Sequence, residues 1–283
     1  MNTLFRLLRA QQWYKNIILF IPLVFSLNLF HTELLVKYII GFFSLAFVSS
    51  SYYIINDIID RHRDKLHPEK KHRPIAAGKV SVGLASFVSF LCLAAAVYLA
   101  SFINRPFLYT VLFMFVYILT YSLFLKHEAF IDILVVAFNF VIRTIAGIFI
   151  LEVTFISPWI ISCTFFLALL ILAGKRRAEL TTLKHEASNH RKTLSTYTSQ
   201  TLDVLLAVSM SFLLLAFALY SVLNDRELLL MSMPVTVYIL LRYLNAVYTS
   251  NAQARNPELF LRDWRILLSL FIWFVLIVLA LYL

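Results

Sequence analysis

Long apolar runs separated by short polar segments dominate the chain. A membrane-spanning helix needs about 20 predominantly apolar residues, and the pattern predicts nine such helices. They are expected at residues 16–31, 34–58, 80–103, 106–125, 129–151, 156–174, 200–222, 229–248 and 263–283. Before the first span, residues 2–12 have the pattern of an amphipathic helix lying in the membrane interface. The chain is therefore expected to be all-α, a polytopic integral membrane protein with one transmembrane domain over residues 1–283.

Composition supports this class. Only 14% of the 283 residues are charged and 61% are hydrophobic, whereas soluble domains are roughly 25% charged. The net charge of +10 does not require nucleic acid as a partner, because basic loops facing an anionic lipid bilayer give the same excess. Both cysteines, Cys92 and Cys163, lie in apolar segments, which predicts packing without a disulfide.

Lysine and arginine collect on one side of the predicted membrane topology. The opposite loops hold only Lys37, Arg105 and Arg226. The positive-inside rule therefore places the N-terminus in the cytoplasm and the C-terminus outside the inner (cytoplasmic) membrane. Two long charged loops, at residues 59–79 and 175–199, fall on the cytoplasmic face. We expect them to cap a polar cavity of the helix bundle that opens to the cytoplasm.

Four oxygen-bearing side chains share one face where the second span meets the first of these loops. At about 100° per helical residue, Asn56, Asp57, Asp60 and Asp64 fall within an arc of roughly 100°. Carboxylate and amide oxygens suit Mg²⁺, which usually shares its ligands with substrate phosphates. The segment that follows is basic, with Arg61, Arg63, Lys65, Lys70, Lys71 and Arg73. This pattern indicates a site for a metal-bound diphosphate; the alternative is a solvated, acid-tipped helix end.

Polar side chains inside the fifth predicted span are a second candidate feature. Arg143 and Asn139 are four residues apart and share a helix face. A charge at that depth costs about 2.5–3.5 kcal/mol on insertion scales, and such residues usually have a function. Arg143 could instead pair structurally with Asp132 or Glu152. Lys126 and Asp132 flank the start of this span and could reach the same headgroup region.

These residues carry a resemblance to a known family. The run Asn56-Asp57-x-x-Asp60-x-x-x-Asp64 resembles the first aspartate-rich motif of the UbiA-type intramembrane prenyltransferase superfamily. His67-Pro68 and Arg73-Pro74-Ile75-Ala76-x-Gly78 strengthen that resemblance. Within the superfamily the chain is most similar to the decaprenyl-phosphate phosphoribosyltransferase branch. The matching segments are Gln12-Trp13-x-Lys15-Asn16, Tyr121-Ser122-x-x-Leu125-Lys126, Asp132, Phe140-Val141-x-Arg143-x-Ile145-Ala146-Gly147, Lys175-Arg176-x-Ala178-Glu179-Leu180 and Asn256-Pro257-Glu258 with Arg262-Asp263.

The resemblance implies a Mg²⁺-dependent transfer of 5-phosphoribose from 5-phosphoribosyl 1-diphosphate to a membrane polyprenyl phosphate, with release of diphosphate. Asp57, Asp60 and Asp64 are the implied catalytic residues, and together with Asn56 they are the implied Mg²⁺ ligands. The implied substrate-binding residues are Lys15, Arg73, Lys126, Arg143, Lys175, Arg176 and Glu179. Among these, Arg73, Lys175 and Arg176 are expected at the donor phosphates, and Lys15, Lys126 and Arg143 at the lipid phosphate.

One departure from the superfamily pattern separates the alternatives. Most members carry a second aspartate motif after the sixth span, where this chain has Lys175, Arg176 and Glu179. Its absence speaks against the first alternative, a prenyltransferase that moves a polyprenyl chain from its diphosphate to an aromatic or haem acceptor. A membrane transporter is the second alternative, but the sequence lacks an internal repeat and has only five glycines. Homo-oligomerisation is left open.

Overall fold

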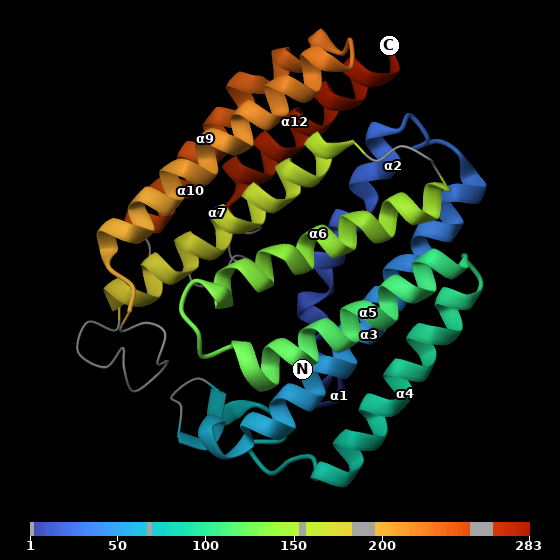
Figure 1. Cartoon of the computed structure of the whole chain (residues 1–283), viewed down its shortest axis with the longest axis vertical. Coiled ribbons are helices and arrows are strands. Elements are labelled where there is room, and N and C mark those ends of the chain that lie inside the picture. The colour runs from blue at the N-terminus through green and yellow to red at the C-terminus, as the bar shows by residue number, and fades with distance from the viewer. Residues whose placement is uncertain (1–2, 67–69, 153–156, 183–195, 250–262) are drawn as a thin grey trace. The chain divides into compact units, whose positions relative to one another are not determined.

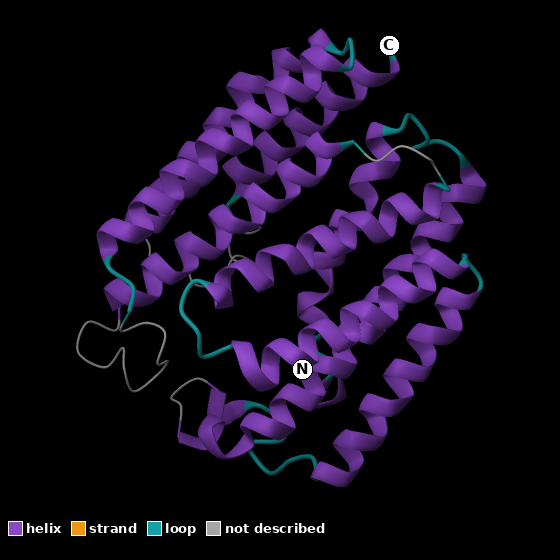
Figure 2. Cartoon of the chain, in the orientation of Figure 1, coloured by secondary structure: helices purple, strands orange, loops and turns teal. Residues whose placement is uncertain are grey.

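The computed structural model describes residues 3–66, 70–152, 157–182, 196–249 and 263–283. All regular elements in these ranges are helices (Figures 1 and 2). The helices form two compact units. Unit 1 comprises Met1–Leu125 and Ile142–Ile156, and unit 2 comprises Lys126–Val141 and Ser157–Leu283. Each unit is described by itself.

Eight of the described helices are long and apolar enough to cross a membrane. They correspond to the second through ninth predicted spans and confirm the all-α membrane class. Their bounds are α3 Thr32–Leu66, α4 Val82–Ser101, α5 Arg105–Thr120 with a π-helical continuation η3 Tyr121–Leu125, α6 Ile131–Leu151, α7 Pro158–Thr182, α9 Ser199–Leu223, η5 Glu227–Ser232 leading into α10 Met233–Thr249, and α12 Trp264–Tyr282.

The N-terminal segment differs from the prediction. Helix α1 covers only Thr3–Leu7, because Arg9 has a left-handed backbone with φ of 50°, which cannot continue a right-handed helix and costs roughly 1–2 kcal/mol. Within the described residues 3–12, the segment is therefore not one continuous helix, and its place in the membrane interface stays a prediction. The predicted span at residues 16–31 is also divided, into the 3₁₀ helix η1 Ala10–Phe20 and the short α2 Ile21–Phe25. The count of nine spans is accordingly not reached by continuous helices within the described ranges.

The two polar connections begin later than the sequence suggested. Helix α3 continues to Leu66 and α7 to Thr182, so residues 59–66 and 175–182 are helical and not loop. Arginine, lysine, glutamate and leucine are good helix formers, and a helix therefore continues after its apolar run ends. Residues 67–69 and 183–195 lie outside the described ranges, so the capping loops stay a prediction. The helical extensions place the candidate charged residues on regular, rigid elements.

In unit 1, α3 is the central helix (Figure 1). It packs against α4, α5, η1 and the short 3₁₀ turn η2 Lys70–His72. The fully buried side chains of Tyr38, Leu45 and Phe107 belong to its main apolar core. Interhelical hydrogen bonds add to this packing: the hydroxyl of Ser44 donates to the carbonyl oxygen of Ala96 over 2.8 Å. Such bonds are typical of helix contacts in membranes.

In unit 2, α7 packs along α9, and α10 contacts α7, α9 and α12 (Figure 1). Leu170, Leu206 and Leu240 are buried in the core between these helices. The hydroxyl of Tyr243 on α10 donates to the carbonyl oxygen of Ile171 over 3.0 Å. Apolar packing between α7, α9 and α10, together with this hydrogen bond between α10 and α7, therefore stabilises the unit.

A close backbone contact in unit 1 explains why position 147 is a glycine. A Cβ atom on Gly147 would lie 2.3 Å from the carbonyl oxygen of Leu19, and this backbone atom cannot rotate away. We expect Gly147→Ala to lower the free energy of unfolding by about 1–3 kcal/mol, as overpacking usually does. Gly83→Ala is the matched control, since a Cβ there would meet nothing within 4 Å. Thermal unfolding in detergent measures both, and equal melting temperatures would contradict the contact.

Candidate active site

The last turns of α3 carry the candidate acid face. Asn56, Asp57, Asp60 and Asp64 all lie within this helix, which confirms that they share a regular helical spacing. Asp57 and Asp64 are each only 3% exposed, whereas Asn56 and Asp60 are half-buried. Two carboxylates are thus largely removed from water and need positive partners to remain charged.

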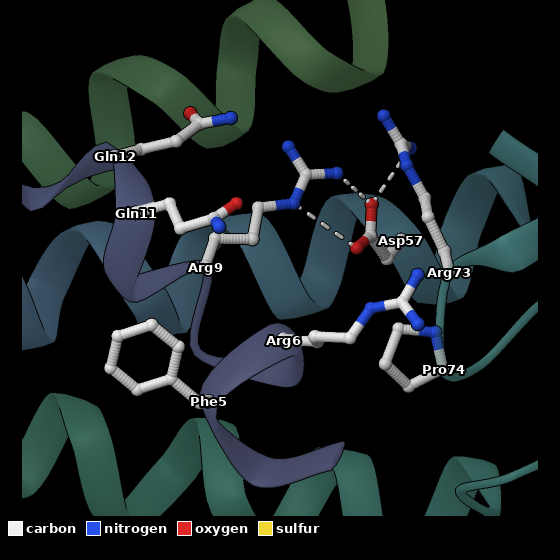
Figure 3. Close-up of a pocket in the computed structure, with 8 residues that line it drawn as sticks. All are labelled: Phe5, Arg6, Arg9, Gln11, Gln12, Asp57, Arg73 and Pro74. Atoms are coloured by element: carbon white, nitrogen blue, oxygen red, sulfur yellow. Dashed lines mark hydrogen bonds and ion pairs between the residues drawn. The ribbon is translucent and has the colours of Figure 1, made fainter. Parts of the chain in front are cut away.

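Two arginines supply those partners. Arg9 donates from Nε to Asp57 Oδ2 over 3.3 Å and pairs through Nη2 with Asp57 Oδ1. Arg73 Nη1 donates to Asp57 Oδ1 over 2.9 Å and to Asp64 Oδ2 over 2.7 Å. Figure 3 shows Arg9 and Arg73 on either side of Asp57. Arg73 therefore bridges two carboxylates that lie two helical turns apart on α3.

A cavity of about 180 Å³ opens beside this cluster (Figure 3). Its polar walls come from Arg6, Arg9, Gln11, Gln12, Asp57 and Arg73. Arg6 lies on α1 and donates from Nη2 to the backbone carbonyl oxygen of His72 over 2.8 Å. The sequence prediction included Arg73 but missed Arg6 and Arg9. In the sequence, these two arginines are notable only for their spacing of three residues in the N-terminal segment. A continuous helix over residues 2–12 gave no reason to expect either side chain beside α3.

A small apolar cluster supports the cavity. Leu7 on α1, Ile54 on α3 and Ile75 after η2 are all buried together. This packing attaches α1 and the segment around Arg73 to the same stretch of α3. The three arginines are thereby held near Asp57 by elements that lie far apart in the sequence.

The acid face fits Mg²⁺ in its chemistry, although the four predicted ligands are not gathered around one point. Within the described ranges no group of three or more His, Cys, Asp or Glu side chains is close enough to hold a metal ion. Mg²⁺ is usually held by one or two carboxylates together with water and substrate phosphates, so a three-acid cluster is not required. Asp57 forms ion pairs with both Arg9 and Arg73. These contacts favour a role in which its carboxylate holds the arginines and does not itself bind the metal.

Arg143 lies in the interior of unit 1. It is 2% exposed, its Nε donates to Asn16 Oδ1 over 2.9 Å, and its Nη2 donates to the hydroxyl of Tyr52 over 3.0 Å. Glu152, one of the acids that the sequence offered as a partner, lies 3.5 Å from Lys37. The buried guanidinium group thus donates hydrogen bonds to neutral oxygens of Asn16 on η1 and Tyr52 on α3. The sequence did not predict these partners.

A second buried network joins α6 and α7 in unit 2. Asp132 is fully buried and lies 3.1 Å from Arg176 Nη2, while Arg176 Nη1 is 2.7 Å from Glu179 Oε2. The hydroxyl of Tyr197 donates to Asp132. Burial raises the pKa of Tyr197, and the hydrogen bond to Asp132 raises it further. Arg176 and Glu179, which we expected at substrate, are therefore also parts of an interior ion-pair network.

The other predicted residues are placed as follows. Lys15 donates from Nζ to Gln12 Oε1 over 3.2 Å at the edge of the cavity. Lys126 and Lys175 belong to unit 2 and are half-buried. Several motif residues lie outside the described ranges, namely His67, Pro68, Asn256, Pro257, Glu258 and Arg262.

Helices of membrane-spanning length, combined with an acid-rich helix end beside arginines, define an all-α integral membrane protein with a polar site. The model of the UbiA prenyltransferase family matches residues 18–275. The chain therefore belongs to the UbiA prenyltransferase family.

Relatives and solved structures agree with this family. A decaprenyl-phosphate phosphoribosyltransferase from Mycolicibacterium smegmatis is 31% identical over 95% of this chain and 89% of the relative. One from Mycobacterium tuberculosis is 32% identical over 90% of this chain and 86% of the relative. The structure of a UbiA homolog from Archaeoglobus fulgidus bound to GPP and Mg²⁺ superposes with a TM-score of 0.69 at 19% identity, covering all of both chains. At that identity the last similarity shows the fold alone.

Proposed function

We propose that this protein is a Mg²⁺-dependent transferase that moves 5-phosphoribose from 5-phosphoribosyl 1-diphosphate to a membrane polyprenyl phosphate and releases diphosphate. The observation that carries the proposal is the acid face of α3 with its bridging Arg73, in a chain similar over nearly its whole length to decaprenyl-phosphate phosphoribosyltransferases. Phosphate-binding cations beside Mg²⁺-type ligands are the chemistry that a sugar diphosphate donor requires.

In this proposal Asn56, Asp60 and Asp64 would hold Mg²⁺ at the donor diphosphate, where the metal neutralises charge on the leaving group when it is bound. Asp57 positions Arg9 and Arg73, whose guanidinium groups can each donate two parallel hydrogen bonds to phosphate oxygens. Arg73, which also contacts Asp64, would stabilise the negative charge that develops as the bond between the anomeric carbon and the diphosphate breaks.

The nucleophile is an oxygen of the lipid phosphate. It forms a new bond to the anomeric carbon, which passes through an oxocarbenium-like state as the diphosphate departs with the bonding electrons. A phosphate monoester has a second pKa near 6 and carries about −1.5 to −2 charge at neutral pH. No proton has to be removed from it, so the chain needs no general base.

The remaining predicted residues take different roles. We assign Lys15 and Arg73 to phosphate binding, and retain Lys126 and Lys175 as candidates for the same task. The burial of Arg143 and Arg176 favours positioning roles for these two arginines. Glu179, held by Arg176, would act with it.

The same proposal includes the location of the site. By the distribution of lysine and arginine, the site and the N-terminus face the cytoplasm and the C-terminus lies outside. The inner (cytoplasmic) membrane is the membrane that this arrangement fits.

Transfer of label from radioactive 5-phosphoribosyl 1-diphosphate to polyprenyl phosphate tests the function directly. We expect purified protein to move label into the lipid phase with Mg²⁺, to stop when EDTA removes the metal, and to recover when Mg²⁺ is restored. A protein that ignores this donor but joins a polyprenyl diphosphate to an aromatic acceptor would instead be an ordinary prenyltransferase. A protein that turns over neither donor, but moves solute across vesicles, would be a transporter.

A further inference from the structure

The cavity beside Asp57 contains more positive charge than its own acids balance. Three guanidinium groups, from Arg6, Arg9 and Arg73, line it together with one carboxylate. Even when Asp64 is counted through its ion pair with Arg73, one positive charge remains in excess. Like charges gathered at one cavity repel one another, so an anion bound there would lower the energy of the arrangement.

The donors in the cavity suit a phosphate group. A guanidinium carries five N–H donors in a planar fork, and the described contacts of Arg6 use only Nη2, on the carbonyl oxygen of His72. Gln11 and Gln12 add amide groups to the same walls. The volume of about 180 Å³ is large compared with the roughly 10–15 Å³ that one water molecule requires. A tetrahedral phosphate with several hydrogen-bond acceptors matches both the space and the donors.

The backbone is arranged to bring these arginines together. Arg9 adopts the left-handed conformation, with φ of 50°, which few residues other than glycine adopt. The resulting turn separates α1 from η1, and Arg6 and Arg9 both reach the cavity (Figure 3). Residues held in strained conformations cluster at binding and active sites, and Arg9 is the residue of this kind that lines the cavity.

We propose that this cavity, the arginine pocket, binds a phosphate monoester group of a substrate, with Arg6, Arg9 and Arg73 as its ligands. The proposal rests on the proposed function, since the 5-phosphate of the donor and the phosphate of the lipid are both monoesters. Their negative charge of about −1.5 to −2 is opposite in sign to the positive excess of the cavity. Asp57 belongs to both the pocket and the acid face, and Arg73 lines the pocket and pairs with Asp57. A monoester bound in the pocket would therefore lie next to the acids that would hold Mg²⁺ at the donor diphosphate.

A binding measurement tests the pocket without requiring turnover. Ribose 5-phosphate at millimolar concentration should raise the melting temperature of the wild-type protein in detergent, because a ligand that binds the folded state stabilises it. Arg6→Gln should lose most of this shift, and Arg6→Lys, which keeps the charge but not the fork, should lose part of it. Arg105→Gln is the matched control: it removes one exposed positive charge from unit 1 at the first position of α5, and Arg105 does not line the cavity.

Kinetics then identify which substrate supplies the phosphate. If the donor does, Arg6→Gln should raise its KM by about tenfold or more, while kcat and the KM of polyprenyl phosphate change by less than about threefold. If the lipid does, the KM of polyprenyl phosphate rises instead, and both outcomes support a monoester site. Equal stabilisation of wild type and Arg6→Gln by ribose 5-phosphate, with both KM values unchanged, would overturn the proposal. An Arg6-dependent stabilisation in a protein without transferase activity would keep the pocket and refute the proposed function.

Discussion

Asp60→Asn is expected to reduce phosphoribosyl transfer by about 1000-fold or more, which corresponds to roughly 4 kcal/mol of transition-state stabilisation. The substitution keeps the size and the helical position of the side chain but removes the anionic oxygen that Mg²⁺ prefers. Asp60 is half-buried on the acid face of α3. Asp64→Asn should have a similar effect, but it also weakens the contact with Arg73, so Asp60 gives the cleaner result.

The control for this experiment lies on the same helix. Glu33 is exposed in the first turn of α3, about 40 Å from Asp60 by the rise of 1.5 Å per residue. Glu33→Gln makes the same chemical change and should leave activity within about twofold of wild type. The assay is the label transfer described above, with melting temperature and gel-filtration profile as checks on folding. Near-normal turnover in both Asp60→Asn and Asp64→Asn would refute the metal assignment.

Arg176→Met is expected to destabilise the protein by about 3–5 kcal/mol, because it leaves a buried carboxylate without its cation. Asp132 is fully buried and lies 3.1 Å from Arg176 Nη2, and Glu179 would remain as a second, like charge nearby. The measurement is the melting temperature in detergent, together with the yield of monodisperse protein. A variant that melts like wild type but has lost donor binding would show that Arg176 serves the substrate and not the fold.

Two further variants make this prediction specific. Asp132→Asn, added to Arg176→Met, removes the orphaned charge and should recover part of the lost stability, as expected for coupled partners. Arg177→Met alters the neighbouring arginine, whose partner Asp203 has a side chain that is 37% exposed. The Arg177 side chain is itself 15% exposed, so solvent reaches this pair as it does not reach Asp132, and Arg177→Met should lower the melting temperature less than Arg176→Met does.

The sequence predicted those features that depend on local periodicity. A run of about 20 apolar residues specifies a spanning helix wherever it occurs, and eight of the nine predicted spans are single helices in the described ranges. The acid face was also accessible, because the spacing of Asn56, Asp60 and Asp64 fixes their common direction once the segment is helical. The broken segment before α3 was not accessible, because the left-handed backbone at Arg9 follows from its tertiary contacts and not from a glycine.

Partner choice was the part that sequence could not determine. Arg143 and Asn16 are 127 residues apart, and Arg9 and Asp57 are 48 apart. The sequence offered Asp132 and Glu152 as alternative structural partners of Arg143, whereas Asp132 binds Arg176 and Arg143 donates to Asn16 and Tyr52. A buried charge contacts whichever polar atoms packing brings near it, and packing depends on distant segments.

The sequence by itself therefore determined the class of protein, the spanning helices and the face of α3 that carries the acids, because each follows from the repeat of a single helix. Only the tertiary structure decided that α1 and the segment after η2 bring three arginines to that face. It also decided that Arg143 and Arg176 are enclosed by polar partners inside their units. Those arrangements arise from contacts between elements that are far apart along the chain, and no local pattern encodes them.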